Sequence, residues 1–284
     1  EKGYAQEQLP QEWTIGKILN RLGYRLRRVK KAIPKKKIPE TNAIFANIAE
    51  VNKAADRSPN ILRISMDTKA TVAVGEYSRN GKSRGTAAIK AQDHDMEVKT
   101  KLIPAGLLNM KNNQLSITFG CSYKTSDFIV DCLEKWWHDN EPYYPQISEL
   151  AINSDNGPET SGKRTQFLYR MVRFADATGL RIHLIYYPPY HSKYNSIERC
   201  WGILENHWNG TLLDSIAKTI AWAKTMTWRG IAPIVSLSEQ IYHKGVSLSK
   251  KAMSLLESRL LRSSYLPLWD ICIEPLVPRY IIFH

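Results

Sequence analysis

The apolar positions of the chain follow two patterns. Short continuous runs indicate buried strands, and runs with three- and four-residue spacing indicate helices. Strand-sized runs come first and then alternate with helical ones, an order typical of a mixed sheet with helices on both faces. We therefore predict an α/β fold with a mixed five-stranded sheet flanked by helices. Strands are predicted at residues 61–66, 71–77 (as a hairpin partner of the first), 114–120, 150–154 and 182–187, and helices at 14–24, 40–55, 125–138, 165–178 and from 195 onward.

Composition narrows the class of protein. The chain has 284 residues, 43% of them hydrophobic, which is enough to bury a full core. Its formal net charge of +13 favours a polyanionic partner such as nucleic acid, although charge alone would also suit an acidic membrane surface. No apolar run approaches the roughly 18 residues of a membrane-spanning helix. The polar start predicts no signal peptide, and four cysteines without a C-x-x-C pair argue against a zinc finger and for a cytoplasmic protein.

The positive charge is concentrated near the N-terminus. Residues 13–39 contain no acid, and within them residues 14–24 have the spacing of a short helix, with Thr14 as its cap and Gly23 as its stop. A short basic helix of this kind fits the recognition helix of a helix-turn-helix, followed by an arm that follows DNA phosphates. The alternative is a solvated surface helix and linker. The predicted DNA contacts are Lys17, Arg21, Arg25, Arg27, Arg28, Lys30 and Lys31.

Three acidic residues stand where a strand ends or a helix begins. Asp67 follows the apolar run 61–66, Asp155 follows the run 150–154, and Glu198 lies in the first turn of the helix that starts near residue 195. Carboxylates delivered from such boundaries are the ligands that hard divalent cations need. The sequence therefore predicts a site for a pair of Mg²⁺ ions, for which Mn²⁺ can substitute.

Each acid also has an ordinary structural explanation. A strand-end residue such as Asp67 is often a turn former, and Asp155 begins an Asp-Asn-Gly-Pro sequence that favours turns. Asn195 and Glu198 match the spacing of a helix capping box. The coincidence of three such acids close to cationic and polar side chains favours the metal interpretation. The predicted DNA contacts near the cations are Lys69, His191, Lys193 and Asn195.

Other candidate chemistry is weaker. Residues 92–95, Gln-Asp-His-Asp, could bind a metal but read as a polar loop, and Glu159 could replace Asp155 as a ligand or be a solvated loop acid. Trp201 and Trp208 fall at helical spacing, which indicates core or interface positions more than platforms for stacking bases. The sequence contains neither a G-x-S-x-G elbow nor a Walker-type phosphate loop.

Residues 188–201 resemble the PP-x-x-S-K-x-N-x-I-E signature of DDE transposases from bacterial insertion sequences, and within them the Rhodopirellula-type DDE transposases. Residues 64–69 are similar to the strand that carries the family's first Asp, and residues 127–137 to its first core helix. Residues 153–157 lie where the second Asp falls. The tail is similar as well, so the resemblance extends over nearly the whole chain to about residue 273.

This resemblance implies a ribonuclease-H-like core shared with retroviral integrases, with Asp67, Asp155 and Glu198 as the catalytic triad. In such a site Asp67 bridges the two cations, water frees a 3′-hydroxyl at the transposon end, and that hydroxyl attacks target DNA. Double-stranded DNA is the implied partner, bound by a homo-oligomer in the cytoplasm with the nucleoid. The turn at residues 156–159 departs from the Gly-rich turn of many relatives, and we expect only a partial helix-turn-helix at the N-terminus.

We expect three parts. These are a helical DNA-binding segment with its basic arm at residues 1–56, a ribonuclease-H-like catalytic domain at 57–230, and a helical extension packed on the core at 231–284. In the extension, Ser249 is expected to cap a helix over 250–262, and residues 269–273 have the character of a short strand. Two rival functions stay open: a nuclease of the same fold that cuts without joining strands, and a non-catalytic DNA-binding protein descended from a transposase.

Overall fold

The computed structural model of the chain describes residues 10–25, 27, 37–92 and 98–279. The chain divides into two compact units, Glu1–Lys35 and Lys36–His284. In the described part of the first unit, helix α1 (Glu12–Arg21) has no buried residue and ends at a turn in which Gly23 has φ of 87°. A second helix, as a helix-turn-helix would need, is absent from residues 10–25 and 27.

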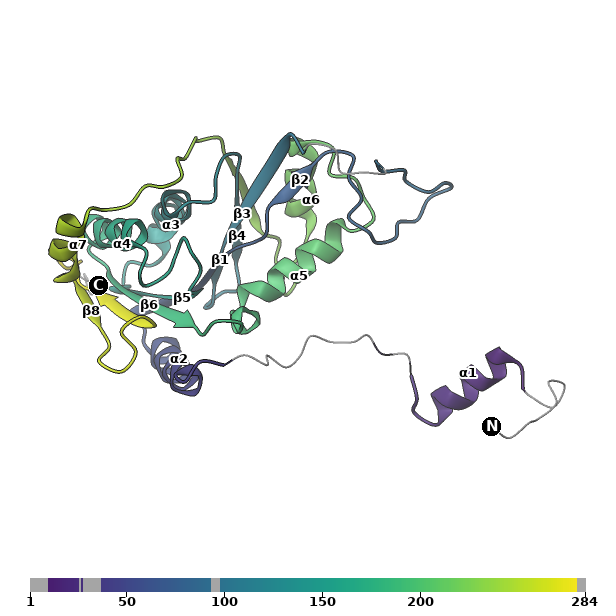
Figure 1. Cartoon of the computed structure of the whole chain (residues 1–284), viewed down its shortest axis with the longest axis horizontal. Helices are drawn as coiled ribbons and strands as arrows, with labels where there is room; N and C mark the ends of the chain where they lie inside the picture. Colours follow the sequence, from purple (N-terminus) through teal and green to yellow (C-terminus); the bar gives the residue numbers. More distant parts are fainter. Residues whose placement is uncertain (1–9, 26, 28–36, 93–97, 280–284) are drawn as a thin grey trace. The chain divides into compact units, whose positions relative to one another are not determined.

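The second unit is built on a nine-stranded mixed sheet (Figure 1). Its centre is the five-strand order β4-β3-β1-β5-β6, in which β1, β5 and β6 are parallel and β3 runs antiparallel to both of its neighbours. This arrangement confirms the predicted mixed α/β fold of the ribonuclease-H-like type. The central strands are β1 (Ile61–Thr68), β3 (Thr100–Asn109), β4 (Leu115–Gly120), β5 (Glu149–Asp155) and β6 (Arg181–Tyr187).

The second strand of the core differs from the sequence prediction. The strand expected at 71–77 is short, β2 (Val72–Val74), and it pairs with β3, not with β1. The true neighbour of β1 is β3, which the sequence reading missed because Pro104 and Gly106 interrupt its apolar run. The Pro104 carbonyl accepts a hydrogen bond from the Lys69 amide at 2.9 Å, and Trp201 occupies the space beside Gly106.

The C-terminal part also differs from the prediction of a helical extension. β7 (Ile234–Ser238) adds to β4, and β9 (Asp270–Ile273) joins β6 and then β8 (Leu260–Arg262), so that the tail extends the sheet at both edges. Ser249 caps α7 as predicted, by accepting from the Ala252 amide at 3.2 Å. The helix stops at Glu257 instead of 262 because the next residues pair with β9.

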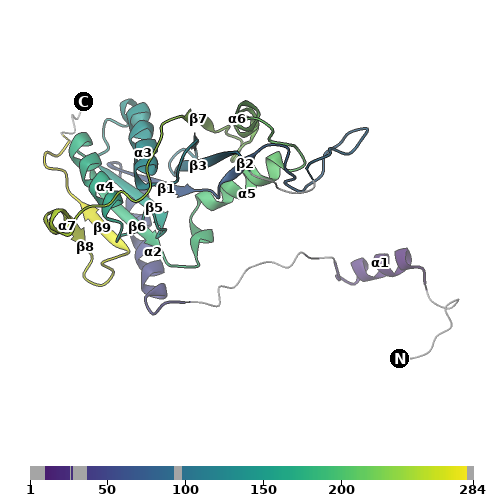
Figure 2. The same cartoon turned by 45° about the horizontal axis from the view of Figure 1, so that its top comes forward.

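Helices cover both faces of the sheet (Figure 2). One face packs against α3 (Ser126–Asn140) and α4 (Thr165–Thr178), which with the sheet form the largest apolar core. The opposite face is covered by α5 (Ile197–Trp208) and α6 (Ile216–Thr225) at one end and by α2 (Thr41–Arg57) at the other. Because α2 packs against this sheet, it belongs with the second unit and not with the N-terminal segment 1–56 of our division. The described residues contain no helix long and apolar enough to cross a membrane.

Candidate active site

Asp67 and Asp155 lie side by side at the ends of two neighbouring strands. β1 and β5 are parallel, with Ser65 opposite Asn153. Two residues further along each strand are Asp67 and Asp155, so the register places both carboxylates at the same edge of the sheet. Both residues line one small pocket, together with Lys124, Glu159 and the end of β1.

Glu198 reaches this edge from α5, whose start is hydrogen-bonded to β1. The Ile197 amide donates to Ser65 Oγ at 3.1 Å, and Asn195 Nδ2 donates to the Met66 carbonyl at 3.1 Å. Ser65 Oγ also donates to Asn195 Oδ1. The first turn of α5 is thereby held against the two residues that precede Asp67.

These contacts correct the capping-box interpretation of Asn195 and Glu198. The N-cap of α5 is Ser196, and no side chain caps the helix locally. Asn195 turns its amide toward β1 instead, because Ser65 provides the acceptor for the first helical amide. Glu198 is therefore not needed as a cap, and it lies half-buried in the first turn.

The pKa of Asp67 reflects the charges of the other two acids. Burial, the negative charge of Asp155 and the negative charge of Glu198 raise the pKa of Asp67 to about 7, against the lowering effect of a hydrogen bond from Trp201. Burial also raises the pKa of Asp155, although the nearby Lys124 charge and the Gly157 amide oppose this. Asp67 thus feels the charges of both other acids, and its ionisation is costly without additional positive charge.

Trp201 contacts Asp67 directly and was assigned from the sequence only to the core or an interface. Its Nε1 donates a hydrogen bond to Asp67 Oδ2 at 2.8 Å from a ring that is 4% exposed. Opposite Asp67 on β3 is Gly106. The one available signal was the position of Trp201 three residues after Glu198, which places both on the same face of a helix.

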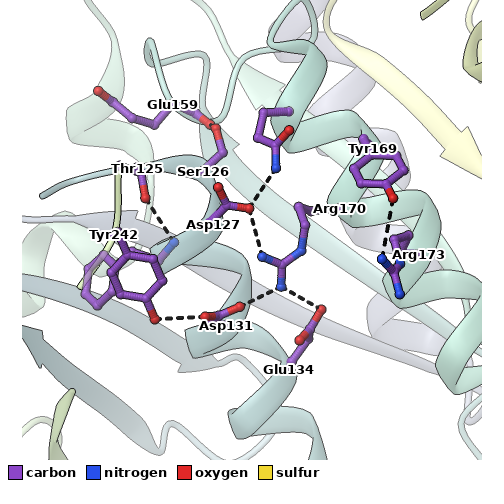
Figure 3. Close-up of polar contacts among 12 residues, drawn as sticks. Thr125, Ser126, Asp127, Asp131, Glu134, Glu159, Tyr169, Arg170, Arg173 and Tyr242 are labelled. Carbon is purple, nitrogen blue, oxygen red and sulfur yellow. Dashed lines mark hydrogen bonds and ion pairs between the residues drawn. The ribbon is translucent and has the colours of Figure 1, made fainter. Parts of the chain in front are cut away.

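Lys124 is a second residue that the sequence reading missed. It lies just before α3 and forms an ion pair with Glu159 at 3.5 Å. Figure 3 shows Ser126, in the first turn of α3, donating to the backbone carbonyl of Glu159 at 2.7 Å. These two bonds attach the loop after Asp155 to the start of α3. Glu159, which we considered as a substitute ligand, is engaged with Lys124.

Comparison with known proteins places the chain in a family. The profile of the Rhodopirellula transposase DDE domain matches residues 1–275. The chain belongs to this family. No curated protein matches the chain.

The solved structures that match the chain share little sequence with it. The Mos1 transposase paired-end complex with left transposon end aligns over 74% of this chain and 61% of its own, with TM-score 0.46 and 8% identity. The Mos1 Strand Transfer Complex aligns over 74% and 60%, with TM-score 0.44 and 10% identity. The human cytomegalovirus terminase nuclease domain aligns over 69% and 71%, with TM-score 0.26 and 10% identity. The chain therefore spans about three fifths of the Mos1 chains that it matches.

In this DDE-domain chain an arginine-centred network braces the two helices that flank the Asp155 loop (Figure 3). Arg170 on α4 contacts three acids of α3, namely Asp127 at 2.9 Å, Asp131 at 2.5 Å and Glu134 at 3.1 Å. Although burial opposes it, these bonds raise the pKa of Arg170. The Tyr242 hydroxyl adds a hydrogen bond to Asp131 at 2.8 Å. All of these acids are satisfied by partners on neighbouring elements, so the network is structural.

Two of the predicted DNA contacts near the acids are buried. His191 is 2% exposed, bonds through Nδ1 to the Pro189 carbonyl at 2.7 Å and packs against the rings of Phe45 and Tyr194. Asn195 is 1% exposed, and its side-chain amide is hydrogen-bonded to the Met66 carbonyl of β1. Both side chains are almost completely covered and bonded within the protein, which disfavours the predicted phosphate contacts.

The cationic candidates are placed differently from one another. Lys69 is paired with Glu205 at 2.7 Å, and the same carboxylate also binds Arg79 at 2.6 Å. Lys193 is exposed and lies over the ring of Tyr194, with Nζ 5.1 Å from the ring centroid. In the first unit Lys17, Arg21, Arg25 and Arg27 are exposed, while Arg28, Lys30 and Lys31 lie outside the described residues.

A second group of possible metal ligands lies away from the acids. His183, Asp270 and Cys272 are the one group among the described residues whose ligand atoms all lie within 4.8 Å of one another. His183 bonds through Nε2 to Asp270 at 2.8 Å and through Nδ1 to Glu149 at 3.4 Å. Burial opposes protonation, but these bonds outweigh it and raise the pKa of His183 to about 11. In the structure the imidazole is held between two carboxylates, so the group forms an ion-pair network. Of the Asp/His cluster at 92–95, residues 93–95 lie outside the described part of the chain.

Proposed function

We propose that this chain is a metal-dependent DNA transposase that cleaves transposon ends and joins the freed 3′-hydroxyl to target DNA. The observation that carries the proposal is the coupling of the acids: Asp67 has its pKa raised to about 7 by burial and then by the charges of Asp155 and Glu198. Each acid comes from a separate element, and the elements are fixed by strand register and by the bonds between β1 and the start of α5. Membership of a transposase DDE family supports the same assignment.

The donor set fits divalent cations such as Mg²⁺ or Mn²⁺. Buried carboxylates that repel one another gain from a cation bound between them, and carboxylate oxygen is the ligand that hard cations prefer. The ligand oxygens of Asp67, Asp155 and Glu198 are not all within 4.8 Å of one another, and the proposal of two cations rests on the chemistry of in-line phosphoryl transfer. Asp67, Asp155 and Glu198 would hold the cations. The bound cations would activate the attacking oxygen and stabilise the leaving oxygen.

The protein's own contribution is positioning and charge. Asp67, Asp155 and Glu198 act as ionised ligands and exchange no proton with the DNA. Strand register sets the separation of the two aspartates, and the Asn195 and Ser65 bonds set the place of Glu198. Water would attack a phosphodiester at the transposon end, and the freed 3′-hydroxyl would attack a phosphodiester of the target DNA. Neither in-line displacement needs a covalent bond to the protein, because positioning and charge neutralisation carry both.

DNA is the proposed partner in both steps. Its phosphates would be met by the exposed cations of the first unit and by Lys193 near the acids, in keeping with the net charge of +13. A homo-oligomer that brings two transposon ends together, acting in the cytoplasm on the nucleoid, follows from the same proposal.

A cleavage and joining assay tests the proposal. Labelled transposon-end DNA with Mg²⁺ should yield nicked ends and then joined products with the wild-type chain, and neither with Asp155→Asn. DNA binding by the variant should stay within a few fold of wild type, because the substitution removes no cation. Cleavage without joining would support the nuclease, and binding without metal-dependent turnover would support the non-catalytic protein.

A further inference from the structure

The hydrogen bond between Trp201 and Asp67 joins a neutral donor to the central acid of the proposed cation site. We propose that Trp201 is a positioning residue for Asp67, whose indole N–H holds Oδ2 and so orients the carboxylate before a cation binds. This inference rests on the proposed function, because it assigns a role within the same site. The 2.8 Å distance from Nε1 to Oδ2 is that of a well-formed hydrogen bond to a carboxylate.

The strand beside Asp67 leaves room for the indole. Gly106 is the β3 residue paired with Asp67. A Cβ atom at this position would come within 2.5 Å of Trp201 Cη2 and 2.8 Å of Ile197 Cδ1. Gly106 is in a strand, and no left-handed backbone explains the choice of glycine there. The absence of a side chain is what lets the ring cross β3 and reach the carboxylate.

The same helix carries the indole and the third acid. Trp201 and Glu198 are three residues apart on α5, so they lie on the same face and move together. The start of α5 is fixed to Ser65 and Met66 on β1, directly before Asp67. The bond from Trp201 adds a further attachment at Asp67 itself. Its effect is to couple the orientation of the Asp67 carboxylate to the position of Glu198.

A neutral donor is suited to this role. The carboxylates repel one another, so an unrestrained Asp67 side chain would gain by rotating away from Asp155 and Glu198. A lysine or arginine could hold it but would compete with the cation for the same charge. The indole N–H fixes one oxygen without adding charge. Donors that orient metal-binding carboxylates in this way typically change metal affinity or activity by about 10–100-fold when they are removed.

Trp208 is a control residue, because it packs in the same core as Trp201 but makes no hydrogen bond to an acid among the described residues. It lies two turns further along α5 and is 0% exposed. Its Nε1 has no hydrogen-bond partner in the described part of the chain. Both rings belong to the same apolar cluster between α5 and the sheet. Replacing either by Phe removes a similar volume, but only Trp201→Phe removes a hydrogen bond.

The test measures Mn²⁺ binding by the full chain in the absence of DNA, by titration calorimetry or by the electron paramagnetic resonance of free Mn²⁺. Trp201→Phe should raise the Mn²⁺ dissociation constant by about 10–100-fold. The dissociation constant of Trp208→Phe should stay within about threefold of the wild-type value. The Mg²⁺ concentration for half-maximal cleavage of end DNA should shift in the same direction. Thermal unfolding without cation controls for folding.

Gly106→Ala provides an independent variant that keeps the indole. Its methyl group should displace the ring from Asp67 and reproduce the loss of Mn²⁺ affinity. The double variant Gly106→Ala/Trp201→Phe should then lose little more than either single one. Equal Mn²⁺ affinities for Trp201→Phe and Trp208→Phe, with wild-type binding that depends on Asp67, would overturn this inference alone. A wild-type chain without Asp67-dependent Mn²⁺ binding would overturn the proposed function as well.

Discussion

Ser65 and Asn195 are joined by a buried side-chain hydrogen bond although 130 residues separate them in the sequence. Ser65 also accepts from the Ile197 amide, and Asn195 donates to the Met66 carbonyl. The pair thus connects the strand that carries Asp67 to the helix that carries Glu198. A catalytic group assembled from distant segments depends on connections of this kind, because neither segment fixes the other locally.

Removal of this pair should lower both stability and activity. Ser65→Ala leaves the Ile197 amide and the Asn195 amide oxygen without their partner, so we expect a loss of about 1–3 kcal/mol in the free energy of unfolding. Asn195→Ala should cost a similar amount. Because the residues act through one another, the double variant should lose less than the sum. Urea denaturation of the four proteins measures the coupling, and strictly additive losses would contradict it.

Asp67→Asn should stabilise the protein in the absence of metal. The folded-state pKa of Asp67, about 7, lies above that of an unfolded aspartate. The folded state therefore holds the proton more tightly, and stability falls as pH rises from about 4 to about 7. An asparagine keeps the neutral state at every pH. The variant should be more stable than wild type at pH 8, by at most a few kcal/mol, and the difference should shrink toward pH 4.

The measurement is urea denaturation with a chelator present, at pH 5 and at pH 8. Excess Mn²⁺ at pH 8 should reverse the order, since a cation stabilises only the chain that binds it. A variant less stable than wild type at pH 8 with the chelator would show that the Asp67 carboxylate is compensated by the protein itself.

The sequence predicted those parts of the fold in which local pattern and tertiary environment agree. The helix at 165–178 and the strands that carry Asp67 and Asp155 have mainly apolar or periodic patterns and were predicted close to their observed limits. β3 was missed because a proline and a glycine stand in it, and both are tolerated only through contacts with other elements. β8 spans only Leu260–Arg262 and depends on pairing with β9, which a local pattern does not reveal.

For the candidate site, the sequence pointed to the acids but not to what holds them. Asp67, Asp155 and Glu198 each follow a recognisable boundary. Trp201 was assigned to the core or an interface. Its ring is buried as expected, but the sequence did not reveal that its N–H bonds to Asp67. His191 was assigned to DNA because its segment is basic, yet packing buries it. The tertiary fold decides which atom of a buried residue contacts which partner. The spacing of residues in the sequence does not reveal these contacts.

His183 should make the stability of the β6–β9 part of the sheet depend on pH. Its folded-state pKa, about 11, lies above the usual value because Asp270 and Glu149 outweigh the effect of burial. The stabilisation is fully present below the unfolded pKa of about 6.5 and is lost as pH rises toward 11. His183→Gln should therefore be destabilised most at pH 6 and progressively less at pH 9. Unfolding free energies at both values check this, and a pH-independent difference would mean that the imidazole is neutral.

Arg27 should contribute to DNA affinity through phosphate contact. It is exposed in a unit rich in cations, so Arg27→Glu should weaken binding to any duplex sequence and reduce the slope of log affinity against log salt by about one. Lys251→Glu on α7 is the matched control, because it makes the same change in net charge on an exposed residue of the other unit. Its salt slope should stay close to that of wild type. Equal slopes for the two variants would show that the first unit acts only through overall charge, and that its arm does not follow the DNA backbone.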